Sequence, residues 1–427
     1  MIHTFASMFK SKEIRKRIFF TLAMLLIYRI GAAIPVPSVN SAALSGPIAD
    51  NSILSMMNLL GGGAFEKMSI FALGVSPYIT ASIIIQLLSM DVIPALTEMT
   101  KSGQKGRIEL DRITRYFGVV LAFVQSASMV YGFDRQYGIL LNSSLATYLF
   151  TATVLTAGTM FLVWIGDQIS VKGIGNGISI IIFAGIVSNI PAMFAQVFNI
   201  EVASAANGAE FTGVLQFMLY VLMYLVIIMA VVVMQLAVRK IPIQYSSAGV
   251  SRGKDVTYLP FKINSASVIP VIFAGSIMTA PQIVLSFVNA DAYTKVSNFL
   301  SLQRPIGLSI YALLTFLFTF FYTDLQIDPD KVAENLGKSG AYIPGIRPGN
   351  ETRTYLRKVL HRITVLGAVA LTVIAILPYL LPMLTTLPSS VSIGGTGIII
   401  VVGVAMETVA QLKGQLTQKQ YHGFLNG

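Results

Sequence analysis

Residues 214–238 read VLQFMLYVLMYLVIIMAVVVMQLAV, a run without a single charged side chain. About 20 apolar residues in a helix are enough to cross a bilayer core of roughly 30 Å. The rest of the 427-residue chain has the same character, because 54% of it is hydrophobic, 11% is charged and the mean hydropathy is +0.72. An ordinary globular domain is about 25% charged. The sequence therefore predicts an integral membrane protein.

Nine further apolar stretches have a similar length. The ten predicted spans are residues 18–34, 70–90, 116–133, 146–166, 177–198, 214–238, 265–289, 307–326, 358–381 and 391–412. Continuous apolar runs indicate helices, because the strands of a membrane barrel alternate apolar and polar residues over about ten positions. The predicted fold class is an all-α polytopic membrane protein. We expect the first span to be a retained helix, although the basic residues before it resemble those of a signal peptide.

The lysine and arginine residues predict the orientation of the chain. Ten spans place both termini on one side of the membrane, and 25 of the 30 basic residues fall on that side. Positive loops stay cytoplasmic, so both termini are predicted to be cytoplasmic. This bias accounts for the net charge of +11 without a nucleic-acid partner. It leaves a basic cytoplasmic face suited to an acidic partner.

The predicted spans divide evenly, with five before the loop at 199–213 and five after it. Five is an odd number, so the second half must enter the membrane from the opposite side, as in an inverted repeat. We therefore expect two halves, residues 1–200 and residues 201–427. Inverted repeats place the functional path at the interface of the halves. Topology alone leaves three classes open: a secondary transporter, an ion channel and a polypeptide channel.

The motifs of common enzymes are missing from the sequence. Neither the phosphate-binding G-x-x-x-x-G-K-[ST] nor G-x-S-x-G occurs, and the chain has no cysteine. Its three histidines, His3, His361 and His422, are too scattered to predict a metal site, and each is expected in a solvated loop or tail. The stretch GIGNG from Gly173 is predicted to be a tight turn between two spans. We expect no enzymatic activity, metal or cofactor.

Few ionisable residues are predicted inside the membrane. Asp167, Asp324 and Glu407 fall near the cytoplasmic ends of their spans, and only Arg29 is expected to lie deep. Arg29 then needs a wet cavity or a partner, such as a backbone carbonyl, unless its side chain snorkels to the surface. A coupled transporter normally keeps ionisable groups at the membrane midplane, so this scarcity weighs against that class.

Six stretches distributed from the first span to the last are more specific. They are RIGAAIPVP from Arg29, FALGVSPYITASIIIQLL from Phe71, GTMFLVWIGDQIS from Gly158, GIGNGISIIIFAG from Gly173, LPFKINSASVIPVIFAGSI from Leu259 and KSGAYIPGIRPG from Lys338. In this order they resemble the SecY family, the central subunits of bacterial protein-conducting channels. The resemblance implies ten helices in two inverted five-helix halves, a central hourglass pore and a lateral gate toward lipid.

The resemblance also implies an apolar constriction in the pore. Val75 and Ile79 are four residues apart and share one helix face. In SecY-like channels the constriction is formed by the positions that match Val75, Ile79, Ile182, Ile272 and Ile400. All five are aliphatic here, so they would exclude water and ions by dewetting and offer no hydrogen bond to a passing polypeptide. Without the resemblance, each would be interpreted as an ordinary packing or lipid-facing residue.

A short, weakly apolar segment near residues 58–69 precedes the second span. It resembles the family's plug, a short helix that closes the outer vestibule. The plug residues would be Asn58, Gly61, Gly62, Gly63, Ala64 and Phe65. Glycines would let such a segment move out without large packing losses. Its composition alone describes a flexible outer loop equally well.

Two cytoplasmic loops are predicted near residues 239–262 and 327–357. The second contains PGIRPG, in which prolines and glycines fix a turn that projects Arg347. By resemblance, this loop docks the motor ATPase SecA or the ribosome. The first loop departs from the family pattern because its tip looks shortened, with Arg252 and Lys254 as the basic side chains there.

Together, these features imply a channel subunit in a bacterial plasma membrane. It would pass unfolded secretory polypeptides with signal sequences and release apolar segments sideways into membrane lipid. The resemblance implies that SecA hydrolyses the ATP, that a SecE-type subunit clamps the halves and that a SecG-type subunit sits alongside. Two alternatives remain: a solute transporter on an inverted-repeat scaffold, and an accessory SecY paralogue with a narrow set of clients.

Overall fold

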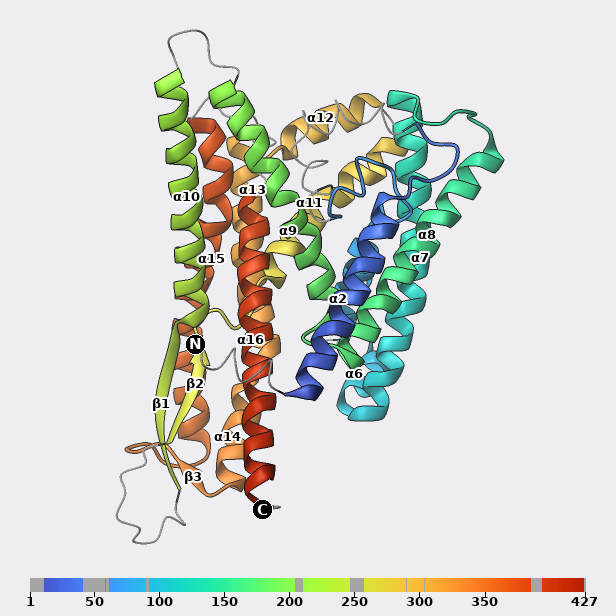
Figure 1. The fold of residues 1–427 in the computed structure, drawn as a ribbon. Coiled ribbons are helices and arrows are strands. Elements are labelled where there is room, and N and C mark those ends of the chain that lie inside the picture. Colours follow the sequence, from blue (N-terminus) through green and yellow to red (C-terminus); the bar gives the residue numbers. More distant parts are fainter. Residues whose placement is uncertain are drawn as a thin grey trace.

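The computed structural model describes residues 11–40, 58, 61–89, 92–203, 210–245, 257–288, 290–302, 304–384 and 394–425. Over these residues the chain is mostly helical (Figure 1), as the continuous apolar runs predict. A helix lies at each of the ten predicted spans. These helices are α2 (Lys12–Ala33), α5 (Ser76–Leu88), α7 (Gln104–Tyr137), α8 (Leu145–Lys172), α9 (Gly177–Phe198), α10 (Glu210–Leu236), α11 (Ile269–Val288), α13 (Pro305–Gln326), α15 (Asn350–Leu384) and α16 (Gly394–Leu425).

Not every one of these helices has the length and hydropathy of a membrane span. Within the part of the chain that the structure describes, seven do: α7, α8, α9, α10, α13, α15 and α16. Helices α5 and α11 contain shorter apolar stretches, and α2 carries charged residues at its start and Arg29 near its end. Membrane crossing by these three helices stays a prediction.

The second predicted span begins too early. Residues 70–75 form turns, and α5 begins only at Ser76. The turns include Gly74, which has a φ of +58° that side chains rarely adopt. Pro77 in the first turn of α5 fixes a helical φ where no amide donor is needed, and so favours a helix start at this point.

The predicted tight turn between α8 and α9 is confirmed. Gly175 has a φ of +71°. The Asn176 side chain accepts hydrogen bonds from the amides of Ile178 and Ser179, at 3.1 and 3.3 Å, and so caps the start of α9. The amide of Ile174 donates to the Thr21 hydroxyl at 3.1 Å, which ties the turn to α2.

The helices form two groups that meet at two seams. In Figure 1, α2, α7 and α8 stand on one side and α10, α13, α15 and α16 on the other, with α9 and α11 between them. At one seam α9 packs against α16, and at the other α11 packs against α7 and α5. After α9 the backbone continues as the π-helical turn η2 (Asn199–Ala203), which contacts α10.

The two predicted cytoplasmic loops contain a small sheet that the predicted fold class did not include. Strand β1 (Val238–Tyr245) pairs antiparallel with β2 (Thr257–Lys262) and with β3 (Ala341–Tyr342) in the order β2-β1-β3. Ile241 and Ile243 in β1 are buried and alternate with exposed neighbours. A search for long apolar runs cannot detect this period of two.

Among the described residues, three short helices were also missed, because each is too short or too polar to resemble a span. Helix α14 (Pro329–Lys338) lies in the predicted loop near 327–357, and α6 (Pro94–Lys101) precedes α7. Helix α12 (Ala290–Leu300) lies at the opposite end of the molecule from the strands (Figure 1).

The outer surface of the helices is strongly apolar. Helix α10 alone exposes Leu215, Met218, Leu222, Leu225, Val226 and Met229. Monomeric soluble proteins rarely expose apolar patches of more than a few hundred Å². These side chains fit a lipid environment, in which an apolar surface is not penalised.

Candidate functional site

The five predicted constriction residues lie in or against one apolar cluster. Val75, Ile182 and Ile400 are buried members of it, with exposed fractions of 5%, 6% and 2%. Ile79 and Ile272 are partly buried and pack against the same cluster. Four helices or their starts contribute these residues, α5 and α9 from the first predicted half and α11 and α16 from the second. The tertiary structure thus brings together residues that lie up to 325 positions apart.

Two of the contributing helices begin at the level of these residues. Val75 is the residue before α5, and its carbonyl accepts a hydrogen bond from the Ile79 amide at 3.1 Å. Ile272 lies in the first turn of α11, and its amide donates to the Val268 carbonyl at 3.3 Å. The starts of α5 and α11 therefore hold Val75, Ile79 and Ile272. A small rotation of either helix would change the distance between these side chains.

The predicted plug segment adjoins this cluster. Ala64 is fully buried in it, and Gly61 and Gly62 are also buried. The backbone from Gly61 to Val75 forms successive turns, so the expected short helix is not present over these residues. Asn58 accepts a hydrogen bond from the Glu66 amide at 3.0 Å, which closes the segment on itself. This packing favours the plug interpretation over a flexible outer loop, which the composition alone describes equally well.

The far end of the segment is anchored by apolar contacts. Phe65 and Met68 are fully buried in a second cluster with Val130 and Phe133 of α7 and Leu155 of α8. The rings of Phe65 and Phe133 pack edge to face, with 5.7 Å between their centroids. Phe65 therefore fixes the segment to the first group of helices.

Arg29 has a hydrogen-bond partner in this segment. Its Nη1 atom donates to the Gly62 carbonyl at 2.9 Å, and the neighbouring Tyr28 hydroxyl donates to the Gly61 carbonyl at 3.1 Å. The sequence predicted that Arg29 needs a wet cavity or a partner such as a carbonyl, and the partner is a carbonyl. Tyr28 was missed, because one tyrosine in an apolar run carries no signal of its own.

The acidic residues near the helix ends show no arrangement for ion coupling. Asp167 pairs with Arg115 of the neighbouring helix α7 at 3.0 Å, and both side chains are partly exposed. Asp324 and Glu407 are exposed on α13 and α16. The described residues contain no group of three or more histidine, aspartate or glutamate side chains that could hold a metal ion.

At one end of the molecule the two predicted loops pack into one unit with its own core. The core joins β1, β2, α14 and the start of α15. Its buried members are Ile241, Ile243, Phe261, Ala333, Leu336, Ala341, Ile343, Leu356, Leu360 and Ile363. We call this unit the loop module.

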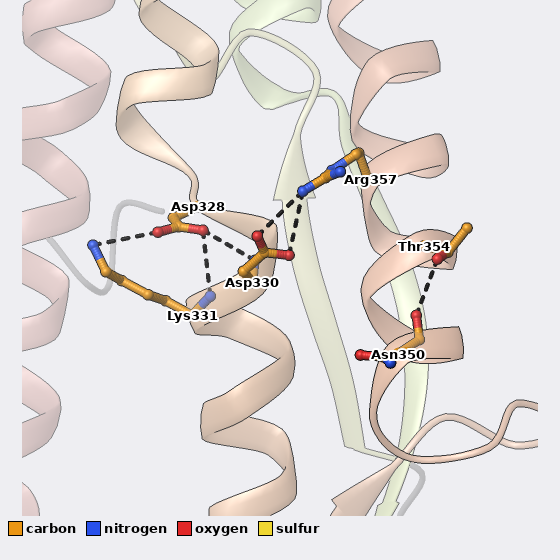
Figure 2. Close-up of polar contacts among 6 residues, drawn as sticks. All are labelled: Asp328, Asp330, Lys331, Asn350, Thr354 and Arg357. Atoms are coloured by element: carbon orange, nitrogen blue, oxygen red, sulfur yellow. Dashed lines mark hydrogen bonds and ion pairs between the residues drawn. The ribbon is translucent and has the colours of Figure 1, made fainter. Parts of the chain in front are cut away.

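Polar contacts at the surface of the loop module support the same arrangement (Figure 2). Arg357 of α15 donates to both carboxylate oxygens of Asp330 in α14, at 3.4 and 3.2 Å. Asp328 caps α14 by accepting from the amides of Asp330 and Lys331. Burial alone would raise the pKa of the Asp328 carboxyl, but these two amides and the Lys331 ammonium, 3.3 Å away, hold that pKa below its usual value.

The predicted docking residues are only partly described. Arg347 is exposed in a turn between Gly345 and Gly349, which have φ values of +81° and +104°. Its carbonyl accepts from the Thr352 hydroxyl at 2.9 Å, so the turn is tied to the start of α15. Arg252 and Lys254 lie outside the described residues.

One histidine differs from its predicted place. His361 lies within α15 and packs against Phe320 of α13, with 5.7 Å between the ring centroids, so the expectation of a loop or tail is wrong for it. His422 belongs to α16 rather than to a loop. His3 lies outside the described residues.

Comparison with known proteins decides the family. A family model described as SecY matches residues 69–409. The protein translocase subunit SecY of Staphylococcus carnosus is 45% identical over 429 residues, which cover 99% of each chain. This chain belongs to the SecY family. The predicted family and the predicted helical membrane fold are both confirmed.

Solved structures share the SecY fold at much lower sequence identity. A structure described as a protein-conducting channel superposes with a TM-score of 0.67 at 19% identity, covering 94% of this chain and 92% of the other. A SecY protein described by the role of its plug domain, which stabilises the closed state and maintains a membrane seal, gives a TM-score of 0.65 at 19% identity. It covers the same shares of the two chains. The roles of individual SecY-family residues in this chain stay predictions.

Proposed function

We propose that this SecY-family chain is the pore subunit of a bacterial protein translocase, through which unfolded secretory polypeptides cross the cell membrane. The observation that carries the proposal is that one apolar cluster, built from both predicted halves of the chain, contains or adjoins Val75, Ile79, Ile182, Ile272 and Ile400. An aliphatic constriction resists wetting and offers a passing chain no hydrogen bonds. As a SecY-family protein, the chain is a channel subunit and not an enzyme.

The segment near residues 58–69 acts as the plug. The burial of Ala64 in the apolar cluster that also contains or adjoins the constriction residues supports this assignment. Hydrogen bonds from α2 and the burial of Phe65 hold it there. In the related SecY protein the plug domain is described as stabilising the closed state, and we assign the same role to this segment.

Apolar segments leave sideways between α5 and α11. A small cluster closes this seam, in which Ile83 of α5 packs with Phe273 of α11 and with Tyr322 of α13. The other seam involves α9, which continues through η2 into the second predicted half. A covalent connection near one seam makes the opposite seam the one that can open, with residues 1–200 and 201–427 as the moving halves.

The loop module faces the cytoplasm together with both termini. Its basic residues, Arg347 and those of α15 among them, suit an acidic partner surface. We assign Arg347 to the docking of the SecA motor or the ribosome, and Arg252 and Lys254 to the same face. A SecE-type subunit and a SecG-type subunit complete the complex, and SecA supplies ATP hydrolysis.

The test uses the absence of cysteine from the chain. A single cysteine at Ile79 should form a disulfide with a cysteine in a stalled secretory chain during SecA-driven export. A cysteine at Leu222, which is exposed on α10, is the lipid-facing control and should stay unlinked. Absence of the Ile79 cross-link, with folded protein and active SecA and SecE, would contradict the pore assignment. The solute-transporter alternative would then be favoured.

A further inference from the structure

The turn at Gly61–Gly63 is held tightly between two helices. Gly62 and Gly63 have φ values of +68° and +80°, a conformation that favours glycine. A Cβ atom at Gly62 would lie 2.8 Å from the Cα of Gly185 in α9 and 2.6 Å from the Tyr28 hydroxyl in α2. A Cβ atom at Gly63 would lie 3.3 Å from the Asn189 side-chain oxygen. The turn fits this place only as glycine.

Two consecutive residues of α2 satisfy two consecutive carbonyls of this turn. Tyr28 donates to Gly61 and Arg29 donates to Gly62, over 3.1 and 2.9 Å. Irregular backbone at membrane depth lacks the internal hydrogen bonds of a helix, so its carbonyls need partners from elsewhere. A guanidinium donor gives a charge-assisted bond, roughly twice as strong as a neutral one.

At the other end of the segment the side chains of Phe65 and Met68 pack in an apolar cluster, and the Met68 carbonyl accepts from the Val36 amide at 2.9 Å. Tyr28 and Arg29 add side-chain donors at the near end. If the segment moves, apolar contacts can be exchanged for other apolar contacts at little cost. A carbonyl that leaves its donor stays unpaired until water or another donor reaches it. The two hydrogen bonds therefore favour one position of the turn over its neighbours.

We infer that Tyr28 and Arg29 form a latch that holds the plug in the closed position, and that opening requires release of their hydrogen bonds to Gly61 and Gly62. The inference rests on the proposed function, because it takes this segment as the plug of a pore. Within it, Arg29 is a positioning residue that acts on the resting equilibrium between the closed and open channel.

The test measures resting ion conductance of the complex in planar bilayers. Arg29→Met and Tyr28→Phe each remove a donor while keeping side-chain bulk. Each should raise the open fraction about tenfold, the effect expected for the loss of one such hydrogen bond. Arg29→Lys keeps a charged donor and should restore most of the seal. Arg17→Met is the matched control, because it removes a positive charge from the same helix at the ion pair with Glu13. It should leave the resting conductance unchanged.

Two reference variants separate failure of the latch from failure of the pore assignment. Deletion of residues 61–68 removes the plug, and Ile400→Asn opens the constriction. If these two variants conduct ions at rest while Arg29→Met conducts no more than the parent, the latch proposal is wrong and the plug assignment is retained. If neither reference variant conducts, the proposed pore is wrong. If Arg29→Met conducts only in proportion to a lowered Tm and Arg29→Lys does not restore the seal, Arg29 has a purely structural role and the latch is overturned.

Discussion

Single residues of this chain take their meaning from what the fold places beside them. Ile400 is one of many isoleucines in the sequence, yet it is almost completely buried in a cluster built from several helices. Arg29 looks out of place in an apolar run until the Gly62 carbonyl is found 2.9 Å away. Residue types alone therefore say little about role here, and the distance to a partner decides it.

Ile400 allows the constriction to be tested directly. Replacing Ile400 with Asn adds an amide of similar size, which water can hydrate, and so removes the dewetting barrier. We expect a leak of small ions at rest, at least tenfold above the parent, measured as flux from proteoliposomes. Ile400→Leu keeps an aliphatic side chain of the same volume and should stay sealed. A tight Ile400→Asn channel would contradict the role of this residue in the constriction.

At the scale of elements, the loop module shows how two separate loops become one unit. Helix α14 presents Ala333 and Leu336 to the core, and β1 presents Ile241 and Ile243. Neither element buries enough apolar surface by itself, because a short helix and a two-stranded ribbon are each marginal in water. Their mutual packing against α15 stabilises both.

Neighbouring residues of α15 separate the contribution of the core from that of the surface. Leu356 is fully buried in the loop module, whereas the Arg357–Asp330 pair is mostly exposed. Leu356→Ala should destabilise the module by about 2–5 kcal/mol, while Arg357→Ala should cost about 0–1 kcal/mol. Hydrogen exchange of the β1 amides reports the difference. Equal effects would mean that the ion pair, and not the apolar core, holds the module together.

The cap of α14 has a defined dependence on pH. Asp328→Ala removes the acceptor for two amides and should destabilise α14 by about 1 kcal/mol, whereas Asn at this position can still accept. The folded pKa of Asp328 is lowered, so its contribution is complete above the unfolded value of 3.8 and is lost as the pH falls through the folded pKa. Exchange of the α14 amides between pH 3 and pH 7 should show this loss in the parent and a smaller one in Asp328→Asn. An identical profile in the two proteins would contradict the assignment.

At the scale of the whole molecule, the two seams between the groups of helices are closed by different sets of residues. The seam of α9 and α16 runs through the large central cluster, which contains Ile182 and Ile400. The seam of α5 and α11 borders the same cluster through Val75 and Ile272 and is also closed by a small cluster around Ile83 and Phe273. Opening this seam must separate the small cluster, at a cost that scales with the apolar area buried there.

A flexible bismaleimide between cysteines placed at Ile83 and Phe273 should lock the second seam. We expect the locked channel to stop inserting apolar segments into lipid, with insertion falling at least tenfold in a reconstituted assay. The same two cysteines without the linker are the control and should retain activity. Unimpaired insertion by the fully linked protein would show that apolar segments do not leave between α5 and α11.

The sequence by itself determined the membrane class, the positions of ten helices and, through its resemblance to SecY, the family. Long apolar runs are a local property, and a helix satisfies its own backbone within such a run, so these features need no tertiary information. Only the tertiary structure decided the start of α5, the strands of the loop module, the partner of Arg29 and the burial of Val75 and Ile400 in one cluster. Each depends on contacts between residues far apart in the chain, and such contacts leave no mark in a local pattern of hydropathy.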